Sequence, residues 1–306
     1  MRRRLSLLSA ACLLVGGLIP APAAAAPIGP TNAPMLLQNV SWQDLAANVN
    51  GICTAGKIGR FTHLMKNVAA NSTLSAPRTY LVEAAKCGYK VWFHFSGTIS
   101  GSTVYPTRVA RWVNAVDWSP HVAGYLSVKE PSWSGIGAVK IRSLYRAFKA
   151  ADPRHPVMAL FGDIPHFGDA ANPYTAGMAD VVMVDWYPVE TASGGCSMSG
   201  RTYITTGPKW YSTKVKPRVR AATPTVPVYV MVQTHKYLAP RCHKKQVPTQ
   251  ALLDRQVREA FVYAGARGIA YHVWSNTNYQ LDQRRSPTVF GWMKSIADRV
   301  HGGTFQ

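Results

Sequence analysis

Strand-like and helix-like runs alternate along this chain about eight times. The strand-like runs are short and apolar, many of them rich in valine, and occupy residues 35–40, 60–65, 89–95, 121–130, 156–161, 180–188, 226–234 and 268–274. Helical patterns occupy residues 43–53, 76–87, 107–116, 139–151, 250–266 and 287–300. Apolar strands separated by helices are typical of a parallel sheet that is buried on both faces. The pattern predicts an α/β protein, a (β/α)8 TIM barrel in a single domain.

The fourth strand-like run ends in a lone carboxylate, Glu130, which a proline follows. In (β/α)8 barrels the functional site lies at the carboxyl ends of the strands. A buried carboxylate without a partner is costly, so its presence at a strand end needs a reason. We therefore expect Glu130 to open into a solvent-reachable site at the mouth of the barrel.

The segment 1–26 has the composition of a secretory signal and not that of the barrel. Arginines at positions 2–4 precede an apolar run from Leu5 to Ile19 and a stretch of small residues that ends at Ala26. This order is that of a signal peptide, and the apolar run is shorter than the ~20 residues that cross a bilayer. We expect cleavage near Ala26, a secreted, extracellular protein without stable membrane insertion, and a barrel domain over residues 27–306.

The cysteines beyond the signal are expected to pair, because exported proteins mature in an oxidising compartment. Cys53 and Cys87 fall in the first two helical layers of the pattern, whereas Cys196 and Cys242 fall in the loops after strands six and seven. Of the possible connectivities, this placement favours Cys53–Cys87 and Cys196–Cys242. Zinc is the competing interpretation, but the spacing of a zinc site does not occur. We expect no metal and no cofactor.

The chain has a net charge of +20, from 34 Lys and Arg against 14 Asp and Glu. The excess is dense in segments 201–220 and 236–245, which we expect to be loops on the same barrel face as Glu130. A field of this sign attracts polyanions. The plainer interpretation is an ordinary soluble surface or simple adhesion to an anionic cell envelope. No nucleic-acid-binding motif occurs, so we expect no nucleic-acid partner, and we expect a monomer.

Four motifs follow one another along residues 75–275. They are Trp118-x-Pro-His-Val-Ala-Gly-Tyr-Leu with Glu130-Pro131 at its end, then segment 145–156, then Asp180-Val-Val-x-Val-Asp-x-Tyr-Pro188, and finally segment 265–271 ahead of Trp274. In this order they resemble secreted glycoside hydrolase-like TIM barrels. The resemblance implies hydrolysis of a glycan, with the glutamate that ends strand four, Glu130, as the general acid/base.

Two positions depart from the pattern of that family. Lys129 stands where an acidic residue often precedes the glutamate, and its charge could lower the carboxyl pKa and weaken a general acid. Gln233 stands at the end of strand seven, where classical retaining members have a nucleophilic glutamate, and an amide cannot form the glycosyl-enzyme ester. The resemblance is therefore stronger for the fold and the sugar site than for a double-displacement reaction.

Cleavage of a glycosidic bond usually requires a second carboxylate. Asp163, Asp185 and Glu190 lie at or beyond the ends of strands five and six, and Asp185 is the first choice because it ends a buried strand. From two strands away, a separation that admits a water molecule, and hence inversion of configuration, is the expectation. The competing interpretation is structural, with Asp185 bound to the backbone or paired with a neighbouring base.

Other strand-end residues are candidates to hydrogen-bond or stack against a sugar, although each alone is more often structural. They are His63, His94, Tyr187, Gln233, His235, Trp274 and Asn276. The sequence lacks the Asp/His motif of a metal-dependent deacetylase and the elbow motif of a serine hydrolase. Two hypotheses stay open: a secreted enzyme that hydrolyses O-glycosidic bonds of a polysaccharide or oligosaccharide, and a non-catalytic barrel that binds an anionic cell-wall or extracellular glycan.

Overall fold

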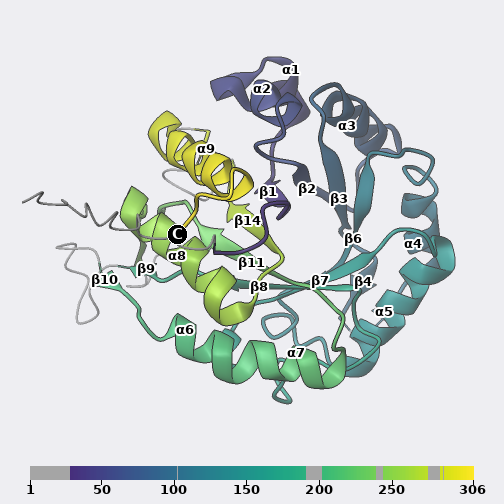
Figure 1. Ribbon diagram of the computed structural model, residues 1–306. Coiled ribbons are helices and arrows are strands. Elements are labelled where there is room, and N and C mark those ends of the chain that lie inside the picture. The colour runs from purple at the N-terminus through teal and green to yellow at the C-terminus, as the bar shows by residue number, and fades with distance from the viewer. Residues whose placement is uncertain (1–27, 102, 191–201, 239–243, 275–282, 285) are drawn as a thin grey trace, which may run out of the picture.

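A closed barrel of eight parallel strands forms the centre of the molecule in the computed structural model (Figure 1). The structure describes residues 28–101, 103–190, 202–238, 244–274, 283–284 and 286–306. In chain order the barrel strands are β1 (Met35–Gln38), β2 (His63–Val68), β3 (Lys90–Phe95), β6 (Val122–Lys129), β7 (Val157–Phe161), β8 (Val181–Trp186), β11 (Val228–Gln233) and β14 (Gly268–His272). Each strand pairs in parallel with its neighbours in chain order, and β14 closes on β1. The predicted (β/α)8 TIM barrel is confirmed.

Helices cover the outside of this barrel (Figure 1). They are α1 (Trp42–Ala46), η1 (Val49–Gly51), α2 (Ile52–Lys57), α3 (Ser75–Lys86), α4 (Pro106–Val113), α5 (Ala138–Ala151), η2 (Ile164–His166), α6 (Gly207–Trp210), η3 (Tyr211–Val215), α7 (Lys216–Ala222), α8 (Gln250–Glu259), η4 (Ala260–Ala264) and α9 (Pro287–His301). The helix predicted at 43–53 is interrupted, because Asn48, Asn50 and Gly51 adopt left-handed φ values of 49°, 52° and 75°. Within the described ranges, no helix has the length and apolar character to span a membrane.

The basic segment 201–220 is mostly helical, so the prediction of a loop was wrong. α6, η3 and α7 run without a break over residues 207–222, on the outside of the barrel after β8 (Figure 1). Pro208 lies in the first turn of α6, where a missing N–H removes no hydrogen bond, and Pro217 directly follows the π-helical turn η3 within the same run. The basic side chains of this segment therefore belong largely to the helical layer.

Short additional strands lie in the connections between the barrel strands. β4 (Ile99–Ser100) and β5 (Thr103–Val104) pair with each other after β3. β9 (Val189–Glu190), β10 (Thr202–Tyr203), β12 (Tyr237–Leu238) and β13 (Lys244–Lys245) form a small sheet from the connections that follow β8 and β11. The second basic segment, 236–245, thus contributes β12 and β13, and its residues 239–243 lie outside the described part of the chain.

The barrel wall separates two apolar cores. The inner core contains Leu36, Met65, Trp92, Leu126, Met158, Leu160, Val181, Met183, Tyr229, Met231 and Ala270. The outer core lies between strands and helices, and aromatic rings fill much of it, as where Phe95 of β3 stacks on Trp112 of α4 at 5.5 Å between centroids. Alternate residues of each strand therefore face either the barrel axis or the helices. Only a residue on the face toward the axis can reach the mouth of the barrel.

A disulfide joins Cys53 of α2 to Cys87, the residue that ends α3, with Cα atoms 4.7 Å apart. The predicted Cys53–Cys87 pair is confirmed. Cys196 and Cys242 lie outside the described residues, so their predicted pairing stays a prediction.

Removing this disulfide should destabilise the barrel. The bond closes a loop with a sequence separation of 34, and a loop of that length restricts the unfolded chain by about 3–4 kcal/mol. We expect the double variant Cys53→Ala/Cys87→Ala to lose about that much free energy of unfolding in a urea titration. Reduced wild-type protein should be no more stable than the variant, because reduction would also break the predicted Cys196–Cys242 bond. A variant as stable as the oxidised protein would contradict this expectation.

Candidate active site

Polar side chains replace the apolar core at the carboxyl ends of the barrel strands. β8 shows the change most simply. Val181 and Met183 belong to the inner core, so strand alternation points Asp185 inward as well, and Tyr187 packs against the same core. Trp186 points the opposite way, toward the helices, and packs on Trp210 of α6 with ring centroids 4.7 Å apart. Asp185 and Tyr187 therefore face the barrel mouth, whereas Trp186 does not.

A bulge in β6 changes which of its residues face inward. Leu126 pairs with Met158 and Val128 pairs with the next residue of β7, Ala159, so Ser127 is the extra residue. The Ser127 hydroxyl donates to the Met158 carbonyl at 3.0 Å. Because an extra residue reverses the alternation beyond it, Lys129 lies on the inner face, paired with Leu160 of the inner core.

Glu130 follows this strand in a left-handed conformation, with a φ of 48°. Its amide still donates to the Leu160 carbonyl of β7 at 2.8 Å, so the ladder continues while the backbone turns. Non-glycine residues seldom adopt this conformation, which often marks a functional position. Glu130 is half-buried, so part of this residue is exposed to solvent.

Gly162, just beyond β7, leaves the space in which Glu130 and Asp185 meet. A Cβ atom at Gly162 would lie 3.1 Å from Asp185 Oδ1 and 3.1 Å from Glu130 Oε1. Both contacts are tighter than ordinary packing allows. The missing side chain at this position therefore lets the carboxyl groups of β6 and β8 approach each other across β7.

The carboxyl groups of Glu130 and Asp185 are joined by a hydrogen bond. Burial, followed by the charge of Glu130 and this hydrogen bond, raises the pKa of Asp185 well above its usual value, while Tyr187 and Lys129 oppose the rise. Asp185 is only 6% exposed. The predicted separation, wide enough for an intervening water, is not what the structure has. A hydrogen-bonded pair of carboxyl groups holds a shared proton.

A wall of rings adjoins the pair on the side of β11 and β14. The Tyr187 hydroxyl donates to Met231 Sδ at 3.2 Å, and the Tyr187 ring lies edge to face against His235, with ring centroids 5.1 Å apart. His235 and His272 have ring centroids 4.7 Å apart, and His272 Nδ1 hydrogen-bonds Gln38 of β1. Burial and the nearby His235 and Lys129 lower the pKa of His272 well below its usual value. The His272 ring is therefore neutral at physiological pH.

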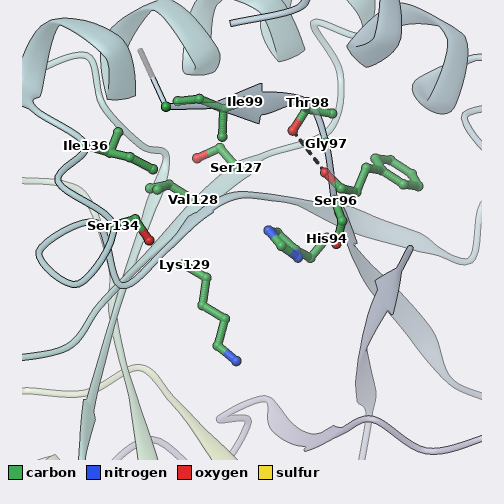
Figure 2. A pocket seen from close by; sticks show the side chains of 12 residues that line it. His94, Ser96, Gly97, Thr98, Ile99, Ser127, Val128, Lys129, Ser134 and Ile136 are labelled. Atoms are coloured by element: carbon green, nitrogen blue, oxygen red, sulfur yellow. Dashed lines mark hydrogen bonds between the residues drawn. The ribbon is translucent and has the colours of Figure 1, made fainter. Parts of the chain in front are cut away.

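On the opposite side of the mouth, a cavity of about 320 Å³ lies between the ends of β3 and β6 (Figure 2). Its lining includes His94 of β3, Lys129 of β6 and Ser134 of the following loop. Burial and the charge of Lys129 lower the pKa of His94 to about 4. The cavity does not include Glu130 or Asp185 in its lining, but Lys129 connects the two regions, because its charge acts on both Asp185 and His94.

The structure brings five predicted site residues together at the mouth: Glu130, Asp185, His94, Tyr187 and His235. His63 is not among them, because β2 begins at His63 and not at residue 60, which puts this side chain at the amino end of the barrel. The placement of His63 near the mouth was wrong. Its pKa is lowered to about 4 by burial and by Lys90.

Two other predicted site residues make structural contacts. The Gln233 amide accepts from the Val189 N–H at 2.9 Å and donates to the Val189 and Gln246 carbonyls at 2.9 and 2.8 Å. Trp274 is fully buried in the outer core and donates to Asp44 at 2.9 Å. Their predicted contact with a sugar stays untested. Asn276 and the side chain of Glu190 lie outside the described part of the structure.

Sequence reasoning missed four residues that shape the mouth. Lys129 was considered only for its effect on Glu130, and its inward position needs the bulge. His272 and Gln38 end strands eight and one on the face toward the barrel axis, and the alternation of residues along these strands would have predicted this. Trp133, three residues after Glu130 in the same loop, is 78% exposed. In the described residues, no group of three or more His, Cys, Asp or Glu side chains could hold a metal ion.

The raised pKa of Asp185 should appear in the pH dependence of stability. The folded chain favours the protonated form of Asp185. The stability that this form contributes is fully present below the unfolded-state pKa of 3.8, and it is lost as the pH rises through the raised pKa of the folded state. Asparagine cannot ionise. Between pH 4 and pH 8, Asp185→Asn should therefore gain stability relative to wild type, by about 1.4 kcal/mol per unit of pKa difference.

Urea unfolding of both proteins across this range measures the effect. Asp298→Asn, which changes a half-exposed carboxyl of α9, controls for the loss of one carboxylate. A stability difference between wild type and Asp185→Asn that stays constant from pH 4 to pH 8 would show that Asp185 ionises normally.

No protein-family model and no curated protein sequence matches the chain. Solved structures do match. A glycoside hydrolase-like protein aligns over 92% of this chain and 97% of its own, with a TM-score of 0.59 and 8% identity. A glycoside hydrolase of family 5, subfamily 18, from Streptomyces cattleya in complex with GlcNAc aligns over 90% of this chain and 81% of its own (TM-score 0.57, 12% identity). The β-galactosidase of Rahnella sp. R3 has a TM-score of 0.62 at 11% identity, and the match covers 91% of this chain and 58% of that enzyme. At these identities the likeness concerns the fold, and the fold of this chain is that of the glycoside hydrolase-like TIM barrels.

Proposed function

We propose that this chain is a glycoside hydrolase that cleaves O-glycosidic bonds of a polysaccharide or oligosaccharide, with Glu130 as the general acid/base. The observation that carries the proposal is the hydrogen-bonded pair of Glu130 and Asp185 at the carboxyl end of the barrel. Active sites of (β/α)8 barrels lie at that end. Carboxyl groups with raised pKa values are the usual acids of glycosidic cleavage.

The two carboxyl groups differ in a way that suits a division of roles. Asp185 is buried and its raised pKa keeps a proton in the pair at pH values where an isolated carboxyl has lost it. Glu130 is half-buried and is the member that a substrate can contact. In the proposed reaction the shared proton passes through Glu130 to the departing glycosidic oxygen as the C–O bond breaks. Water then adds to the sugar, and its proton restores the pair.

Lys129 acts on the pair in the direction that the sequence suggested, but it is not the largest influence on Asp185. Its charge lowers the pKa of Asp185, but burial and the neighbouring Glu130 act in the opposite direction and are the larger causes. Gln233 offers no alternative carboxylate on β11, and its amide is engaged with backbone groups. The proposed cleavage therefore uses no covalent ester at the end of β11.

Trp133 gives the proposed site an aromatic surface for a sugar. It lies in the loop that follows Glu130, its amide donates to the Glu130 carbonyl at 3.1 Å, and its side chain is 78% exposed. Ser134 and Ile136 of the same loop line the neighbouring cavity. A large apolar ring left in water beside a carboxyl pair is suited to stack against the apolar face of a sugar ring.

Secretion belongs to the same proposal. Segment 1–26 has the order of a signal peptide, and the Cys53–Cys87 disulfide is consistent with maturation in an oxidising compartment. The charge of +20 would hold the exported protein on an anionic envelope.

The alternative function is a non-catalytic barrel that binds an anionic glycan, which the absence of a carboxylate at Gln233 favours.

Glu130→Gln should abolish hydrolysis while leaving the fold intact. The amide keeps the shape of the side chain but holds no transferable proton, and loss of a general acid typically lowers the rate by about 100-fold or more. Release of reducing ends from a panel of neutral and acidic polysaccharides measures the effect. Asp185→Asn should lower the rate as well, because the pair then has no second carboxyl group to share a proton.

Glu83→Gln is the matched control, since Glu83 lies on α3 and pairs with Lys86 at 2.7 Å, away from the barrel mouth. Its rate should equal that of wild type. If Glu130→Gln and wild type act equally on every polysaccharide of the panel, the catalytic assignment is wrong, and retained binding without turnover would favour the non-catalytic alternative.

Trp133→Ala should weaken binding of an oligosaccharide by about 3- to 10-fold, which is the range for loss of one aromatic contact. Trp118→Ala is the control, because Trp118 is also exposed, at 58%, but precedes β6 and so lies toward the amino end of the barrel. Affinity electrophoresis in polysaccharide gels compares the two. Equal retardation of both variants and wild type would exclude Trp133 as a sugar platform.

A further inference from the structure

The cavity between β3 and β6 contains a cation that the proposed reaction does not require. Lys129 lies on the inner face because of the bulge at Ser127, and it lines the cavity together with His94. Among the residues that the structure describes, no carboxylate oxygen lies within 4.0 Å of a Lys129 nitrogen. A half-buried ammonium group without a close counter-ion is able to attract an anion from solution.

His94 supplies a second polar group to the same space. Its side chain and that of Lys129 extend from β3 and β6 toward the space between the two strands (Figure 2). His94 Nδ1 is buried, and it has no hydrogen-bond partner in the described part of the chain. A buried ring nitrogen without a partner costs free energy unless a ligand or water satisfies it. A neutral imidazole can donate one hydrogen bond, and an ammonium group can donate three.

The surroundings of these two groups fit a small polar ligand. The cavity volume of about 320 Å³ lies within the range of roughly 300–1,000 Å³ that is usual for small-molecule sites. Ser96 and Ser134 line it, which adds hydroxyl groups to the two nitrogen donors. The chain as a whole has a net charge of +20, which concentrates polyanions near its surface.

We propose that this cavity binds the carboxylate of a uronic acid unit, so that the substrate of the barrel is an acidic glycan. Lys129 and His94 together bind the carboxylate, and Lys129 sets the preference for a charged over a neutral sugar. The identification of the ligand as a glycan rests on the function proposed above. Lys129 lines the cavity and directly precedes Glu130 in the chain, so a bound acidic sugar would lie near the proposed acid.

The test compares charged and neutral forms of the same oligosaccharides. The probes are trimers of glucuronic acid and of galacturonic acid, each beside its carboxyl-reduced, neutral counterpart, and binding is measured by calorimetry. Wild type should prefer at least one acidic trimer over its neutral counterpart, and Lys129→Met should lose about 10-fold or more of the affinity for that trimer. Lys129→Arg should retain most of the preference, which also shows that the position tolerates substitution.

Lys57→Met is the control for general charge, because Lys57 is exposed at the end of α2 and the variant removes one positive charge without touching the cavity. The inference is overturned if wild type binds no acidic trimer better than its neutral counterpart, or if Lys129→Met and Lys57→Met lose the same affinity. Binding needs no turnover. A Lys129-dependent preference in a protein that hydrolyses nothing would therefore support the acidic site and refute the proposed hydrolase.

Discussion

One extra residue in β6 determines the chemistry of the barrel mouth. Without the bulge at Ser127, strand alternation would turn Lys129 toward the helices. The hydrogen bond from Ser127 to the Met158 carbonyl ties the bulge to β7, and the Glu130 amide resumes the ladder at Leu160. The left-handed backbone at Glu130 then directs its carboxyl toward β8. A local irregularity thus places a cation and a carboxyl group, adjacent in sequence, in the same mouth.

The charged groups of this mouth act on one another at a distance, without a close ion pair between Lys129 and a carboxylate of the described residues. Two carboxyl groups that share one proton carry one negative charge, and Lys129 carries one positive charge nearby. The same ammonium group disfavours protonation of His94 and His272, which burial already disfavours. The histidines are consequently neutral hydrogen-bonding groups and not additional cations. Removing Lys129 would leave the carboxyl pair as the dominant charge of a largely buried site, because this lysine acts on Asp185, His94 and His272.

The sequence predicted those features that depend on local patterns and missed those that depend on register. Apolar runs located the barrel strands, and the parity of β8 was enough to place Asp185. The strand start at His63 could not be read, because residues 60–65 and 63–68 are both plausible strands and differ in which end His63 occupies. The bulge at Ser127 leaves no signature in a run that is apolar on both faces. The helices of 207–222 were missed as well, because the pattern predicted no helix between strands six and seven and the basic residues were taken to lie in a loop.

The close approach of the two carboxyl groups could not be predicted either, because it depends on what is missing at Gly162. This glycine is not required by the backbone, since its φ is not in the left-handed range that the structure has at Glu130 and Asp163. It is favoured by space, because a methyl group there would lie 3.1 Å from a carboxyl oxygen of each acid, so these side chains would have to shift by a few tenths of an ångström. A larger residue would have to separate Glu130 from Asp185 or displace β7. Proton sharing in this site is therefore a consequence of packing: the neighbouring strand contributes no side chain, and the two acids occupy the space that this leaves.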